Sequence, residues 1–191
     1  QAFDCQSIGT YQPLQTARAS ADRAQRYLEQ EWTDAEVAPY NRTTGIVTAA
    51  LIGGYSRIYL GEGFCSMAIS SVFRDETVYG GEITRDSVFG QAETKFSQVI
   101  TLATAADSTL RRAATLGRAR ARLNRGNFAG ARADAMLIPA GFNYSVSASA
   151  TSSRRENRIW AQNNSNTDAT LVDSATYVAR NASRTFFSRS W

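Results

Sequence analysis

The sequence predicts an all-α protein. Small and apolar residues recur every three or four positions over several long segments, which is the period of an amphipathic helix. Residues that cap helices precede some of these segments, and glycine or proline follows several of them. Alanine and glycine supply many of the apolar positions, which allows neighbouring helices to pack closely. We therefore expect helices arranged as antiparallel hairpins.

The N-terminal third is expected to hold three helices, the second of them short. Pro13 is tolerated in a first helical turn, and the stripe that follows runs to about residue 32 and comprises Leu14, Ala17, Ala21, Ala24 and Leu28. Thr33 and Glu36 have capping-box spacing and predict a short helix that ends before Pro39. A long helix is expected over 43–60, with an inward stripe of Val47, Ala50, Leu51, Gly54 and Ile58. Residues 61–65 (GEGFC) are expected to break it.

The middle of the chain is expected to contain a loop and a further long helix. Residues 66–83 are predicted as a loop with one short strand. Residues 84–87 offer several N-caps for a helix over about 86–105. Its inward side chains are expected to be Val88, Phe89, Ala92, Phe96, Val99, Ile100 and Ala103.

Residues 107–139 predict a helical hairpin. The stripe of its first helix comprises Leu110, Ala113, Ala114, Gly117, Ala121 and Leu123. Gly126 can end that helix in the left-handed conformation, and Pro139 ends the second. The inward positions of the second helix are expected to be Phe128, Ala131, Ala135 and Ile138. Two helices joined by a short turn with alanines at the contact form one unit of the tetratricopeptide kind.

The composition changes after Pro139, which predicts a helical-repeat domain over 1–141 and an extended Ser/Asn/Arg-rich C-terminal arm over 142–191. Such an arm cannot bury a core of its own. Its aromatic and arginine side chains either dock on the protein's own helices or contact a partner. The candidate partner interface is Trp160, Arg180, Arg184, Phe186, Phe187, Arg189 and Trp191.

Composition excludes several kinds of site. The 191 residues carry a formal net charge of +4, and Lys95 is the only lysine, so almost all positive charge is arginine. Arginine suits planar contacts at interfaces, although a GC-rich genome would give the same bias. The absence of histidine removes Ser-His-Asp and Cys-His catalysis and the commonest metal ligand. Two cysteines are too few for a thiolate zinc site, and no cofactor is expected.

Cys5 and Cys65 are the only cysteines, and their even number favours one disulfide and an extracytoplasmic location. The alternative is two separate buried thiols. A disulfide closing about sixty residues would stabilise the fold by about 4 kcal/mol in the entropic description. No stretch is long enough to cross a membrane. A chain that opens on Gln1 suggests that a targeting segment was removed.

Several motifs resemble the RagB/SusD-like family of outer-membrane lipoproteins. They are residues 60–66 (LGEGFCS), the helix pattern Ala92-Glu93-x-Lys95-Phe96-x-x-x-Ile100, the run 117–124 (GRARARLN) with Gly126 and Ala131, and Pro139-x-Gly141-Phe142. The resemblance extends over about residues 17–160, in a chain less than half the usual length of the family. No lipid-carrying N-terminal cysteine and no family ligand residue can be assigned.

This resemblance implies a non-enzymatic tetratricopeptide-like scaffold in the periplasm or at the outer-membrane surface. It implies capture of a glycan or peptide for a TonB-dependent transporter. The helical-repeat surface and the C-terminal arm favour a different function, in which the chain docks on a larger membrane protein complex and stabilises it. Short SusD-like chains are also associated with extrinsic subunits of bacterial photosynthetic reaction-centre complexes. Candidate ligand-facing side chains for capture are Trp32, Tyr40, Tyr144 and Trp160.

Two other function classes receive less support. A carboxylate-pair hydrolase would need acidic groups that converge in a cleft, and the nominees are Glu62 with Glu93 or Asp107 with Asp134. A nucleic-acid role would rest on Arg118, Arg122, Arg125 and Arg132, which share one helical face. Such a run is usually a solvated face or a contact with acidic protein. We therefore expect neither enzyme activity nor nucleic-acid binding.

Overall fold

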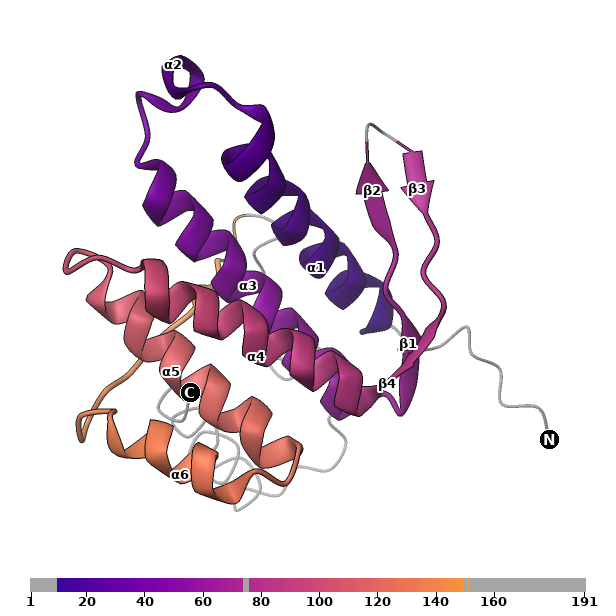
Figure 1. Cartoon of the computed structure of the whole chain (residues 1–191), viewed down its shortest axis with the longest axis vertical. Coiled ribbons are helices and arrows are strands. Elements are labelled where there is room, and N and C mark those ends of the chain that lie inside the picture. Colours follow the sequence, from indigo (N-terminus) through magenta and orange to yellow (C-terminus); the bar gives the residue numbers. More distant parts are fainter. Residues whose placement is uncertain (1–9, 74–75, 150, 152–191) are drawn as a thin grey trace. The chain divides into compact units, whose positions relative to one another are not determined.

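The computed structural model describes residues 10–73, 76–149 and 151, and this part of the chain is mostly helical (Figure 1), as predicted. The helices are α1 (Tyr11–Arg26), the π-helical turn η2 (Tyr27–Glu31), α2 (Asp34–Val37), α3 (Arg42–Gly63), α4 (Arg85–Leu102), α5 (Ser108–Asn124) and α6 (Phe128–Met136). The strands are β1 (Ser66–Ala68), β2 (Ser71–Phe73), β3 (Glu76–Val78) and β4 (Glu82–Thr84).

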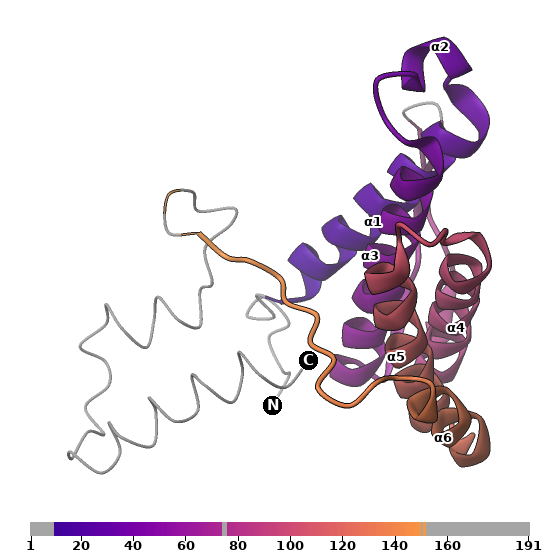
Figure 2. The same ribbon diagram turned by 90° about the vertical axis from the view of Figure 1, so that its left-hand side faces the viewer.

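The helix α3 is the centre of the bundle. It packs against α1 on one side and against α4 and α5 on the other (Figure 2). The predicted stripe of α3 is entirely buried and comprises Val47, Ala50, Leu51, Gly54 and Ile58. The hydrophobic core therefore follows this helix.

Two phenylalanines of α4 pack directly onto glycines of α3. A Cβ added at Gly54 would lie 2.6 Å from Cε1 of Phe96, and one added at Gly61 would lie 2.7 Å from Cε1 of Phe89. Gly117 on α5 is equally close, because its Cβ would lie 2.5 Å from Cζ of Phe96. The fully buried ring of Phe96 thus fills the space where three helices meet.

The long helix ends within the predicted break at residues 61–65, but after Gly61 and not at it. Helix α3 continues to Gly63, where the backbone N–H of Phe64 still donates to the carbonyl of Leu60 at 3.0 Å. Glycine at position 61 serves close packing instead of helix termination.

The loop predicted after α3 contains four short strands. β1 pairs antiparallel with β4, and β2 pairs antiparallel with β3, so the two pairs form a narrow ribbon beside α1 (Figure 1). Met67 of β1 packs with Leu60 and Val88 in a buried cluster that ties the ribbon to the helices. Strands of three residues are too short to show a clear alternating pattern in the sequence.

The helix α1 is rotated relative to its predicted stripe. Ala21 is buried as expected, but Ala17 and Ala24 are exposed, while Arg18 and Gln25 are buried. Arg18 bonds to Gln15 and Asp22 of its own helix, and Gln25 bonds to Lys95 and Gln98 of α4. These polar partners are the reason why apolarity alone misjudged the inward face. The capping box of Thr33 and Glu36 is confirmed at the start of α2.

The turn between α5 and α6 is as predicted, but the orientation of α6 is not. Gly126 adopts the left-handed conformation with φ of 75°. On α6, Ala131 is buried as expected, but Phe128 and Ala135 are exposed and Asp134 is buried. The Phe128 and Ala135 expectation is therefore wrong, because ion pairs to α5 hold the helix with its carboxylate inward.

The chain divides into two compact units, Gln1–Pro139 and Ala140–Trp191. All the elements above belong to the first unit. In the second unit Gly141 has a left-handed backbone with φ of 81°, and residues 142–149 follow without helix or strand.

Candidate protein-binding groove

An open groove lies between α1 and α3. It has a volume of about 650 Å³. The residues that line it are small or neutral side chains from both helices and from the turn before α3, namely Ala17, Ser20, Ala21, Ala24, Tyr40, Asn41, Thr44, Gly45, Thr48, Ala49 and Ile52. Their spacing of three and four residues along each helix places them on facing stripes. Among the described residues that line the groove, none carries a charge.

Small side chains create this groove because the two helices meet closely with little to fill the space beside their contact. A Cβ added at Gly53 of α3 would lie 3.7 Å from Cβ of Ala21 on α1, and one added at Gly45 would lie 2.9 Å from Cδ1 of Leu28 in the adjoining turn η2. Two larger side chains flank the hollow: Tyr40 is 74% exposed and Ile52 is 47% exposed. The groove is therefore neutral, with large side chains that carry apolar surface at its edges.

The connection between α1 and α3 is rigidly held at the end of the groove. The Arg42 guanidinium donates to the carbonyls of Leu28 and Trp32, the latter at 2.8 Å, and pairs with Asp34 at 3.1 Å. The Asn41 side chain caps α3 by accepting from the backbone N–H of Thr44 at 2.9 Å.

Trp32 lies in this connection and is stacked on Tyr27. The ring centroids are 5.7 Å apart and the planes differ by 13°. Arg23 and Arg26 both approach the Tyr27 ring, each with Cζ 5.6 Å from its centroid. Trp32 remains 45% exposed, so one aromatic surface is held in place and open.

Away from the groove, α1 meets α3 and α4 through a polar cluster around Asp22. Its carboxylate contacts Arg57 at 2.7 Å, Lys95 at 3.0 Å and Arg18 at 3.2 Å. Burial alone would raise the pKa of Asp22, but the hydrogen bonds and charges of Arg57 and Lys95 outweigh burial and lower it. Burial and the nearby Arg57 charge lower the pKa of Arg18 in spite of Asp22.

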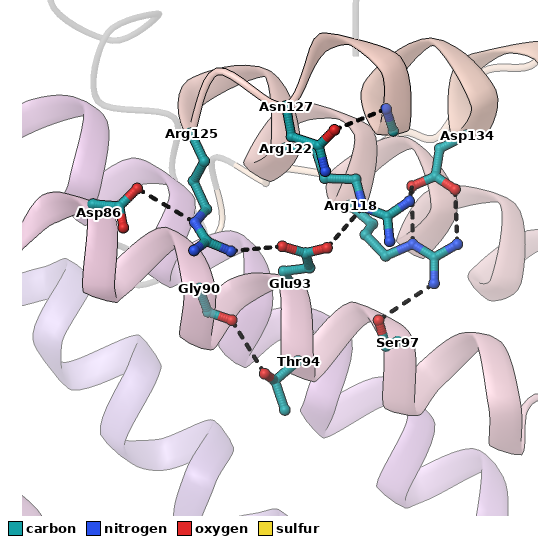
Figure 3. Close-up of polar contacts among 11 residues, drawn as sticks. Asp86, Gly90, Glu93, Thr94, Ser97, Arg118, Arg122, Arg125, Asn127 and Asp134 are labelled. Carbon is teal, nitrogen blue, oxygen red and sulfur yellow. Dashed lines mark hydrogen bonds and ion pairs between the residues drawn. The ribbon is translucent and has the colours of Figure 1, made fainter.

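A second ionic cluster joins α4, α5 and α6 (Figure 3). Asp134 is 2% exposed and accepts from Arg118 at 2.7 and 2.9 Å and from Arg122 at 2.9 Å. Glu93 pairs with Arg122 at 2.7 Å and with Arg125 at 2.9 Å. Partial burial would raise the pKa of Glu93, but these two arginines overcome burial and lower it.

Three of the four arginines nominated for nucleic-acid binding form ion pairs within this cluster. Arg118, Arg122 and Arg125 bind carboxylates of the protein itself, and Arg125 also contacts Asp86 at 3.3 Å. Only Arg132 of the four is exposed with no hydrogen bond or ion pair to the rest of the described chain. A run of arginines on one helical face is here a set of internal ion pairs.

The nominated catalytic carboxylates are likewise engaged. Glu62 pairs with Arg120 at 2.5 Å and accepts from Asn124, while Asp107 accepts from Thr44 at 2.9 Å and from Thr104 at 2.8 Å. The hydroxyl hydrogen bonds of Thr104 and Thr44 lower the pKa of Asp107. Glu62 and Glu93 pair with different arginines. Asp107 bonds to threonines whereas Asp134 pairs with arginines, so this nominated pair shares no partner among the described contacts either. Across the described ranges no cluster of metal-ligating side chains occurs.

The predicted site residues are not brought together into one site. Tyr40 lines the groove and Trp32 lies in the adjoining connection. Tyr144 belongs to the second unit and is half-buried, which raises its pKa. The candidate partner interface lies outside the described residues and comprises Trp160, Arg180, Arg184, Phe186, Phe187, Arg189 and Trp191.

The predicted Cys5–Cys65 disulfide receives no support from the structure. Cys65 is an exposed free cysteine between α3 and β1, and Cys5 lies outside the described residues. No helix within the described ranges is long and apolar enough to span a membrane.

Sequence reasoning missed the groove itself. The signal was present in the pairing of a small-residue stripe on α1 with Gly45, Thr48 and Ala49 on α3. The helical stripe that includes Ala17 and Ala24 does not reveal the groove, because small residues at helical spacing fit a closed contact and an open groove equally well.

Searches of protein-family models, of curated proteins and of solved structures find no match for this chain. The resemblance to RagB/SusD-like proteins therefore stays a prediction, and function has to be argued from the groove and the surfaces around it.

Proposed function

We propose that this protein is a non-catalytic scaffold subunit that holds a helix of a larger membrane protein complex in the groove between α1 and α3. The observation that carries this proposal is an open, neutral groove of about 650 Å³ between two long, firmly packed helices. Recognition of a partner helix in a groove is a recurring mode of protein binding.

The lining favours a helix over other occupants. Ala17, Ser20 and Ala24 on one wall, with Thr48 on the other, allow a helix backbone to approach closely and leave room for its larger side chains. A neutral wall gains nothing from a charged occupant, since burying an unpaired charge is costly. Tyr40 and Ile52 at the edges are of the side-chain types that bury apolar area on association.

The non-catalytic part of the proposal rests on the contacts of the nominated carboxylates. The acidic side chains nominated for catalysis are occupied by arginine or threonine partners in the described part of the chain. We also propose that the hairpins are tetratricopeptide-like, that the protein works outside the cytoplasm, and that the C-terminal arm wraps the same complex.

The proposal is tested by filling the groove. Ser20→Trp and Ala24→Trp place an indole in the hollow and should abolish co-purification with a membrane complex in detergent. Thr94→Trp is the matched control, because Thr94 is exposed on α4 and does not line the groove. Circular dichroism checks that each variant is folded. Co-purification that survives both groove substitutions would refute the proposal.

Capture of a glycan for a TonB-dependent transporter is the second candidate, and the exposed, stacked Trp32 favours it. A held aromatic face suits stacking against a sugar ring. The test is titration of Trp fluorescence with a broad panel of oligosaccharides. A response that disappears in Trp32→Ala but persists in Tyr79→Ala supports capture, and a flat titration removes it.

A further inference from the structure

A cluster of large apolar side chains is exposed around α6, separate from the groove. Leu123 is 55% exposed, Phe128 68%, Met136 71% and Leu137 70%. They lie at the end of α5, along α6 and directly after it. We call these four residues with Arg132 the α6 face. A concentration of apolar side chains in water marks an interaction surface.

The orientation of α6 is fixed by the ionic cluster, so the exposure of this face is built into the fold. Asp134, on the opposite side of the helix, is held by Arg118 and Arg122 (Figure 3). The Asn127 side chain caps the helix by accepting from the backbone N–H of Gly130 at 3.0 Å. Turning Phe128 and Met136 inward would break these contacts.

The charge of the α6 face indicates an anionic partner. Arg132 lies between Phe128 and Met136 at spacings of four residues, and it makes no hydrogen bond or ion pair with another described residue. The single acidic residue of α6, Asp134, points inward. The α6 face holds no acidic side chain, so a second copy of this chain that docked through the same face would offer Arg132 no carboxylate partner.

The shape of the face favours a lipid surface over a protein. Its side chains are exposed on α6, a helix of nine residues, and on the residues close to its two ends, whereas a stable protein interface takes about 800 Å² from each partner and seats its anchors in pockets. A fluid bilayer interface accepts protruding apolar side chains without a matching surface, and arginine can extend to the phosphates above them.

We propose that the α6 face binds an anionic membrane surface, with Phe128, Met136 and Leu137 entering the headgroup–acyl boundary and Arg132 contacting lipid phosphates. Binding of this kind is peripheral and reversible. It is independent of the partner helix proposed for the groove.

The test is sedimentation of the full chain with vesicles of phosphatidylcholine alone or with 30% phosphatidylglycerol added (about the anionic fraction that gives a clear surface charge). We expect binding to the anionic vesicles that weakens with salt. The double variant Phe128→Ser/Met136→Ser should lose this binding, and Arg132→Gln should weaken it about fivefold. The matched control is Val78→Ser/Tyr79→Ser, which removes two exposed apolar side chains from the ribbon and should bind normally.

Absence of binding to anionic vesicles, or equal loss in the ribbon control, would overturn the proposal. It would also be overturned if Phe128→Ser/Met136→Ser kept vesicle binding but lost association with a protein complex, because the face would then be a protein interface. Ser20→Trp should leave vesicle binding unchanged, so failure of the groove proposal and failure of the lipid proposal are distinguishable.

Discussion

Asp134 is the side chain on which the position of α6 most depends. It is almost fully buried and accepts three hydrogen bonds from Arg118 and Arg122. Removing one member of a buried ion pair leaves its partners uncompensated. We expect Asp134→Ala to lower the free energy of unfolding by about 3 kcal/mol, measured by urea denaturation.

Glu82→Ala is the control, since Glu82 is exposed on β4, and its effect should be within about 0.5 kcal/mol. Equal effects of the two variants would contradict this role.

Glu93 and Asp22 make stability depend on acidity. The pKa of each is lowered in the folded protein by neighbouring arginine or lysine. The unfolded chain therefore binds more protons in acid, so stability is complete above about pH 4 to 5 and falls as the pH drops through the lowered values. Urea unfolding at pH 7, 5, 4 and 3 should show this decline, and Glu93→Gln should reduce it. An identical decline in Glu93→Gln would show that Glu93 contributes nothing.

At the scale of elements, the contact of α3, α4 and α5 around Phe96 should tolerate no added methyl group. Gly117→Ala would put Cβ against the buried ring, which we expect to cost about 1–3 kcal/mol of unfolding free energy. Gly63→Ala is the matched control, because no atom lies within 4 Å of its added Cβ. It should be neutral or stabilising by about 0.5 kcal/mol. Thermal denaturation followed by circular dichroism measures both, and a stable Gly117→Ala would contradict the close packing.

Most helices could be predicted from the sequence because caps and periodicity are local. Thr84 caps α4 and Gly126 ends α5 in the way that their chemistry dictates. The buried face of α4 was also predictable, because Phe89 and Phe96 are large apolar side chains that gain from burial wherever the helix packs. These are properties of one element at a time.

The features that could not be predicted depend on contacts between elements. Asp134 points inward because it forms ion pairs with Arg118 and Arg122 on α5, and this orientation of α6 exposes Phe128. Gly61 lies within the last turn of α3, and the ring of Phe89 on α4 occupies the space that a side chain at position 61 would fill. The groove could not be predicted for the same reason, because whether space remains between α1 and α3 depends on how the two helices pack.

At the scale of the whole molecule, the described helical unit has two surfaces with different chemistry. The groove between α1 and α3 is neutral and hollow, while the α6 face is apolar, protruding and basic at Arg132. The first suits a helix of a protein partner, and the second suits an anionic lipid surface. Together they fit the scaffold that we propose, which would hold a membrane protein complex at the membrane to which it belongs.

Site-specific photo-cross-linking from the groove tests this account most directly. A benzophenone amino acid in place of Tyr40, which lines the groove and is already a large exposed aromatic side chain, should cross-link to one integral membrane protein within intact membranes of the source cells. The same group in place of Thr94 on α4 should not, and Ala24→Trp should suppress the cross-link from position 40. A cross-link of equal yield from both positions, or none from position 40, would contradict the claim that the groove holds a partner helix.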